Sequence, residues 1–133
     1  MKTYKLLLLG FSLSCATLSA QAQGFQNLDF ESANIPNSTS PGSLIPISEG
    51  LPGWSGYFIS SIATNQVTQV AYEGISLGGN EISIVDTNVG FGFNPIQGTY
   101  SAFLFGGGSS APYYSATISQ TGLVPSGTAS LQF

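Results

Sequence analysis

Polar and apolar side chains alternate along several short stretches of this chain. In residues 27–31, Leu28 and Phe30 fall on one side of an extended backbone, and the polar residues fall on the other. This period of two is typical of a β-strand that buries one face. The same criterion predicts strands at residues 27–31, 54–60, 66–72, 81–86, 99–105, 114–120 and 128–133, with a short edge strand at residues 44–48.

Two of these stretches say more about the fold. Trp54, the only tryptophan, follows a turn made by Pro52 and Gly53. We interpret it as a core residue, since tryptophan is highly buried on average. In residues 99–105 apolar side chains occur on both sides of the strand, so we expect both of its faces to be covered. No helical periodicity follows residue 22, and the pattern predicts an all-β fold, an antiparallel β-sandwich.

The first 22 residues have a different pattern, that of a secretory signal peptide. Lys2 and Lys5 give a positive start, residues 6–13 are mainly apolar, and the residues that end at Ala22 have the small-x-small form of a cleavage site. The apolar stretch is well short of the roughly 20 residues that span a bilayer, which disfavours a membrane anchor. The sequence therefore predicts cleavage after Ala22 and a β-sandwich domain over residues 23–133.

Cleavage at this position changes the chemistry that is available to the chain. The mature part has 133 − 22 = 111 residues, and it loses both lysines and the single cysteine, Cys15. It contains no arginine and no histidine, so its six carboxylates give a side-chain charge of 0 − 6 = −6.

These absences exclude several classes of function. Without Lys or Arg the domain cannot neutralise phosphate groups, which excludes nucleic-acid binding and attraction to anionic lipids. Without His or Cys it cannot build a Ser-His or Cys-His nucleophile, or a zinc, copper or haem site. Carboxylate and carbonyl oxygens remain, and these are the ligands that calcium prefers.

The order of the motifs resembles that of a known group of exported domains. An N-x-x-F-E stretch at residues 27–31, a long Pro- and Ser-rich loop, and L-P-G-W at residues 51–54 resemble jelly-roll domains of the galactose-binding-like type, which many carbohydrate-binding modules share. Residues 95–101 and 118–133 are similar to bacterial exported proteins with a C-terminal PEP-CTERM sorting signal. Jelly rolls have about eight strands, and this chain stops inside a predicted one. We therefore expect residues 23–133 to be the N-terminal portion of a truncated sandwich.

Candidate site residues are few, and none of them forms a catalytic set. Asp29 and Glu31 share one strand face, but neighbouring carboxylates on a flat face rarely enclose a substrate, so catalysis is disfavoured. The resemblance implies that Glu31 helps to hold a structural calcium ion. Tyr57, Tyr113 and Tyr114 are the candidate ligand-binding side chains, since the amphipathic rings of tyrosines suit stacking on sugars.

The composition and the resemblance together lead to two hypotheses. In the first, the chain is an exported, non-catalytic component of the cell surface or extracellular matrix that binds neutral polysaccharide, because it has aromatic side chains and no basic ones. In the second, it is a calcium-dependent carbohydrate-binding module of a larger glycosidase. A sorting signal or a catalytic domain encoded after Phe133 would separate the two. Neither hypothesis includes a transmembrane segment beyond the leader.

We expect the secreted form of the protein to begin at Gln23, because signal peptidase cleaves after the small-x-small sequence that ends at Ala22. Intact mass and N-terminal sequencing of the secreted form measure this directly. A secreted form that retains Lys2 or Lys5, or one with a diacylglyceryl group on Cys15, would show that residues 1–22 are not a cleaved signal peptide.

Overall fold

The structure is a computed structural model that describes residues 24–75, 79–87, 95, 97–108, 112–124 and 126–129. The predicted leader, residues 1–22, lies outside the described residues, as do residues 130–133 of the last predicted strand. The described part contains seven strands and one short helix: β1 (Leu44–Pro46), α1 (Ile47–Gly50), β2 (Ser55–Ile59), β3 (Thr64–Val67), β4 (Gln69–Tyr72), β5 (Glu81–Asp86), β6 (Tyr100–Phe105) and β7 (Ser115–Ser119).

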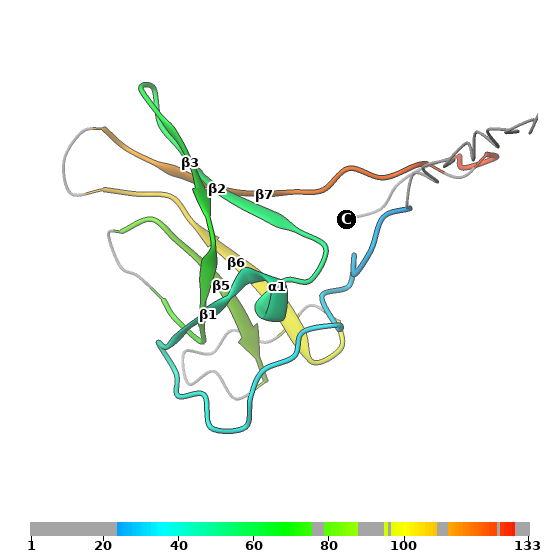
Figure 1. Cartoon of the computed structure of the whole chain (residues 1–133), viewed down its shortest axis with the longest axis horizontal. Helices are drawn as coiled ribbons and strands as arrows, with labels where there is room; N and C mark the ends of the chain where they lie inside the picture. Colours follow the sequence, from blue (N-terminus) through cyan, green and yellow to red (C-terminus); the bar gives the residue numbers. More distant parts are fainter. Residues whose placement is uncertain are drawn as a thin grey trace, which may run out of the picture.

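The strands form two sheets that lie against each other as a sandwich (Figure 1). One sheet has four strands in the order β1-β4-β5-β6, and the other has three in the order β3-β2-β7. All neighbouring strands are antiparallel except β4 and β5, which are parallel. The expected all-β architecture with two mainly antiparallel sheets is confirmed.

The chain passes from one sheet to the other at Thr68. The sequence pattern predicted one strand over residues 66–72, but β3 ends at Val67 in the three-stranded sheet and β4 starts at Gln69 in the four-stranded sheet. A bend at one residue leaves the alternation of side chains almost undisturbed, so the pattern alone could not reveal the change of sheet. This corner brings the starts of β4 and β5 next to the three-stranded sheet.

The core lies between the two sheets, and β5 is its central strand. Every residue of β5 after Glu81 is buried, because β5 has a paired neighbour on each side. The core cluster consists of Ile45, Leu51, Val70, Ile82 and Ile84. Burial of each such side chain contributes roughly 1.5–3 kcal/mol to folding. Coverage of both faces was predicted for residues 99–105, and this is wrong in part: β6 is at the edge of its sheet, and its Leu104 is 43% exposed.

The predicted opening strand at residues 27–31 is also wrong. These residues form turns, and Asn27 and Phe30 have positive φ angles of 49° and 64°. The turn is fixed by its contact with Trp54, whose indole Nε1 donates to the Asn27 carbonyl at 2.9 Å and whose ring centroid lies 5.5 Å from that of Phe30. Trp54 packs against the core as predicted. The two stretches that define the resemblance are therefore in contact, but the first is not a strand.

The short helix α1 was not predicted, because four residues are too few to produce a helical period. It ends at Gly50, which is buried beside the core. A Cβ atom at this position would lie 2.6 Å from Val70 Cγ2 and 3.1 Å from Ile45 Cδ1. The lack of a side chain at Gly50 lets α1 approach the four-stranded sheet closely.

We therefore expect Gly50→Ala to lower the free energy of unfolding by about 1–3 kcal/mol through overpacking. This is expected although alanine is otherwise favoured over glycine in a helix by up to about 1 kcal/mol. Urea denaturation measures the change. Ser48→Ala, at an exposed position of the same helix, is the control and should change stability by less than about 0.5 kcal/mol. Equal stability of Gly50→Ala and wild type would show that α1 can move away from the sheet at little cost.

Candidate functional site

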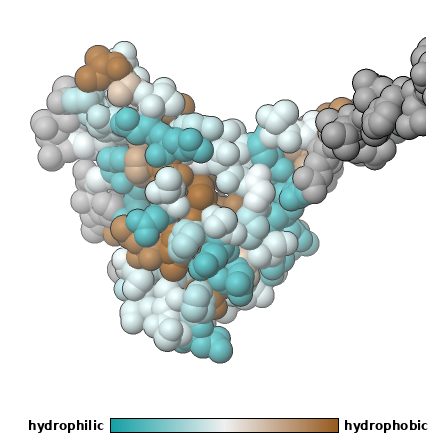
Figure 2. Space-filling view, viewed as in Figure 1, coloured by the Kyte–Doolittle hydropathy of each residue, from teal (hydrophilic) through white to brown (hydrophobic). Residues whose placement is uncertain are grey.

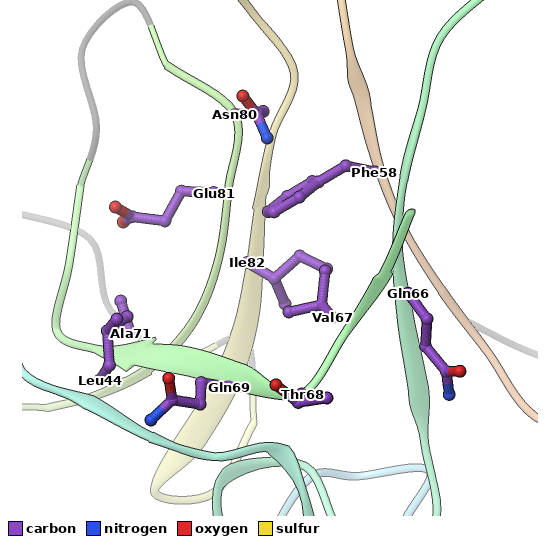
Figure 3. Close-up of a pocket in the computed structure, with 10 residues that line it drawn as sticks. All are labelled: Leu44, Phe58, Gln66, Val67, Thr68, Gln69, Ala71, Asn80, Glu81 and Ile82. Carbon is purple, nitrogen blue, oxygen red and sulfur yellow. The ribbon is translucent and has the colours of Figure 1, made fainter. Parts of the chain in front are cut away.

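A groove of about 370 Å³ opens at the corner where the chain changes sheets (Figure 3). A volume above about 300 Å³ is in the range of small-molecule sites. Most of the lining residues belong to strands β1 to β5, and two others, Thr68 and Asn80, directly precede β4 and β5. The full lining is Leu44, Phe58, Gln66, Val67, Thr68, Gln69, Ala71, Asn80, Glu81 and Ile82.

The inner wall of the groove is apolar. Phe58 and Val67 come from the three-stranded sheet, and Ile82 comes from β5 of the other sheet, so this wall is a part of the core that reaches the surface. Leu44 on β1 extends the wall and is 63% exposed. The space-filling view also shows hydrophobic side chains that reach the surface near the middle of the body (Figure 2).

The rim of the groove is polar and nearly uncharged. Gln69 and Glu81 begin two parallel strands, and the register of β4 and β5 places them side by side at one end of the sheet. Thr68 and Asn80 precede these strands and add a hydroxyl and an amide. Among the described residues of the lining, Glu81 is the only ionisable one, and its Oε1 accepts a hydrogen bond from Ser83 Oγ at 2.8 Å. In Figure 3 the side chain of Gln66 points away from the others.

The three tyrosines predicted to bind ligand do not line this groove. Tyr57 lies opposite Gln66 and Thr117, and opposed residues of antiparallel strands share a face. Its neighbour Phe58 faces the core, so Tyr57 lies on the outer face of the three-stranded sheet. Tyr113 is 68% exposed just before β7. Tyr114 forms two backbone hydrogen bonds with Gly107, which connect the end of β6 to the start of β7.

Glu31, the predicted calcium ligand, makes a different contact. Its Oε1 accepts hydrogen bonds from the backbone N–H groups of Thr99 and Tyr100, at 2.8 and 2.9 Å. It therefore ties the N-terminal turns to the start of β6. Asp29, its neighbour, accepts a longer bond from the Glu31 backbone N–H at 3.3 Å. Among the described residues, no group of three or more His, Cys, Asp or Glu side chains is arranged to hold a metal ion.

Another group of polar side chains is buried where the parallel strands β4 and β5 end, whereas the groove lies where they start. The Tyr72 hydroxyl donates to Asp86 Oδ2 at 2.8 Å, and Glu73, the next residue after Tyr72, is also buried. Burial and the neighbouring Asp86 carboxyl raise the pKa of Glu73 to about 7. Burial and the bond to Asp86 also raise the pKa of Tyr72 well above its usual range. Tyr72 therefore acts as a neutral donor.

The sequence offered only a weak signal for either cluster. Asn80 follows two glycines and Glu73 precedes one, which is typical of turns, but a turn signal does not show which side chains are buried beside it. The groove depends on the bend at Thr68, and the carboxyl cluster depends on the parallel pairing of β4 with β5. Both are long-range features that local patterns do not encode.

Comparison of the chain with protein-family models, with curated proteins and with solved structures gives no match. Within the described residues, every helix is too short and too polar to cross a membrane.

We expect Glu31→Ala to lower the free energy of unfolding by about 1 kcal/mol, since it removes the acceptor of two backbone N–H groups in a partly solvated place. Chemical denaturation in the presence of a chelator measures this loss. Asp29→Ala is the control and should change stability by less than about 0.5 kcal/mol, because it removes one longer bond. If calcium stabilises the wild type and Glu31→Ala abolishes that effect, Glu31 is a calcium ligand and its role is not limited to this contact.

Proposed function

We propose that this chain is an exported, non-catalytic β-sandwich protein that binds neutral polysaccharide, and that the groove at the sheet corner is its binding site. The observation that carries the proposal is the combination of an apolar wall with an almost uncharged rim of amide, hydroxyl and carboxylate groups. The position of the protein at the cell surface or in the extracellular matrix follows from the predicted leader and from the PEP-CTERM resemblance.

The chemistry of the groove suits a sugar ring. A pyranose has C–H faces that pack on apolar side chains and hydroxyls that each need a donor and an acceptor. The amides of Gln69 and Asn80 supply both functions within one side chain, and the Thr68 hydroxyl does the same. Phe58 adds an aromatic surface at the wall. A buried hydroxyl without such partners would lose its hydrogen bonds to water, so this combination favours carbohydrate over a purely apolar ligand.

The charge of the chain favours a neutral polymer. Outside Lys2 and Lys5 there is no basic side chain to pair with a uronate, sulfate or phosphate group. Six carboxylates give residues 23–133 a charge of −6, which repels an anionic polymer at low salt. Glu81, at the rim, adds a negative charge at the site itself.

We expect affinity electrophoresis to show retardation of the protein by at least one neutral polysaccharide, such as a β-glucan, a xylan or a galactomannan. Gln69→Ala and Asn80→Ala should each weaken the interaction about fivefold, because each change removes hydrogen bonds worth on the order of 1 kcal/mol. The two positions are polar and do not belong to the core cluster, so both variants should remain folded.

Tyr57→Ala together with Tyr113→Ala is the matched control, because these side chains lie away from the groove. Loss of binding only in this control would move the site to the outer face of the three-stranded sheet. Retardation only by anionic polymers, weakening steeply with salt, would contradict the proposed function itself.

A further inference from the structure

Two buried carboxyl groups meet where the parallel strands β4 and β5 end. Glu73 directly follows β4, Asp86 is the last residue of β5, and each is only 6% exposed. The Asp86 carboxyl is near enough to Glu73 to raise its pKa, and after burial it is the largest cause of that rise. The Tyr72 hydroxyl already donates to Asp86, which fixes Asp86 as the acceptor of this cluster.

The residues that the structure describes include no basic side chain to neutralise this pair. Lys2 and Lys5 are the only basic residues of the chain, and both belong to the predicted leader outside the described residues. The titratable groups that face the pair from adjacent strands are tyrosines: Tyr72 on β4, and Tyr100, which lies opposite Asp86 on β6. Two negative charges in contact and out of water repel strongly, so they are not expected to ionise together.

Glu73 has two unusual structural features. Its Oε1 is buried and accepts no hydrogen bond from the described residues. Its backbone is held at a φ of 48°, in the left-handed region that glycine prefers. The backbone N–H of Glu73 donates to the Ile84 carbonyl at 2.9 Å, which fixes the Glu73 backbone beside β5.

We propose that Glu73 and Asp86 share a single proton, and that this proton fastens the end of β4 to the end of β5. The protonated carboxyl donates an O–H···O bond to the other carboxylate, which leaves one negative charge for the Tyr72 hydroxyl to stabilise. The raised pKa of Glu73, about 7, agrees with this arrangement. The bond matters because the parallel ladder is short, with two residue pairs in register: Ala71 with Ser83, and Tyr72 with Ile84.

A metal ion is a poorer partner for this pair than a proton. Calcium takes six to eight oxygen ligands, whereas the cluster supplies two carboxylates and a tyrosine hydroxyl. No third His, Cys, Asp or Glu side chain joins them among the described residues.

The proposal predicts that the protein loses stability as the solution becomes more basic. Glu73 binds its proton with a pKa of about 7 in the folded chain and 4.5 in the unfolded chain. The stabilising effect is therefore complete below pH 4.5 and is lost as pH rises through 7. In this window the folding equilibrium constant should fall by up to tenfold per pH unit, because the folded state holds one proton more than the unfolded state. Urea denaturation of the full chain at pH values from 4 to 9 measures this slope.

Glu73→Gln is the decisive variant, since its amide still donates to Asp86 but cannot ionise. Its stability should be nearly independent of pH between 5 and 8, and at pH 8 it should equal or exceed that of the wild type. Asp29→Asn, at an exposed position, is the control and should keep the wild-type slope. If Glu73 had only a packing role, Glu73→Gln would shift stability by the same amount at every pH.

A second measurement does not depend on the variant folding. The chain has four glutamates and two aspartates, so carboxyl carbon NMR of Glu- and Asp-labelled wild type gives six resolvable side-chain titrations. One glutamate should titrate near pH 7, and one aspartate should respond in the same range. The proposal is overturned if every glutamate titrates below about pH 5, if wild-type stability is flat from pH 5 to 8, or if calcium at neutral pH stabilises the wild type but not Glu73→Gln.

Discussion

The absence of a positive side chain after Lys5 is the constraint on which the polar structure of this domain depends. A folded chain with six carboxylates usually pairs some of them with Lys or Arg, and here that is impossible. Glu31 is satisfied by two backbone N–H groups of β6, Glu81 by the hydroxyl of Ser83, and Asp86 by the hydroxyl of Tyr72. Each of these three carboxylates therefore contacts a backbone N–H group or a neutral hydroxyl, and none of these contacts is with a charged side chain.

These contacts lie at or near the ends of β4, β5 and β6. Exposed ion pairs are worth at most about 1 kcal/mol, whereas a hydrogen bond to a charged group contributes about 1.5–3 kcal/mol when it is shielded from water. At one end of the sandwich, Tyr72 and Asp86 close the parallel pair. At the other end, Phe58 and Ile82 lie beside a polar rim with Glu81 as its charged member among the described residues, and that end is the one that opens as a groove. The same sheet is thus closed at one end and accessible at the other.

The sequence predicted the strands well where burial repeats every two residues and failed where contacts are long-range. Residues 81–86 were predicted with the observed bounds, since β5 lies in the centre of a sheet and its apolar positions are regular. Residues 27–31 have the same alternation, yet they form turns because contacts with Trp54 hold Phe30 in a conformation that a bulky residue rarely adopts. No local pattern shows which residue will pack on a distant tryptophan. For the same reason the pattern could not show that Glu73, which precedes Gly74 in a turn, is buried.

A pair of carboxyl groups that differ in their affinity for protons is also what acid–base enzymes use, so the cluster at Glu73 has to be weighed as a catalytic site. A glycosidase places the sugar between two carboxyl groups about 5–9.5 Å apart, whereas Glu73 and Asp86 are each only 6% exposed, which leaves little access for a sugar. The Tyr72 hydroxyl occupies one oxygen of Asp86. The groove, in turn, has Glu81 as its single ionisable group, and that carboxylate is bonded to Ser83. The acidic pair is buried at the ends of β4 and β5, whereas the groove opens at the starts of these two strands.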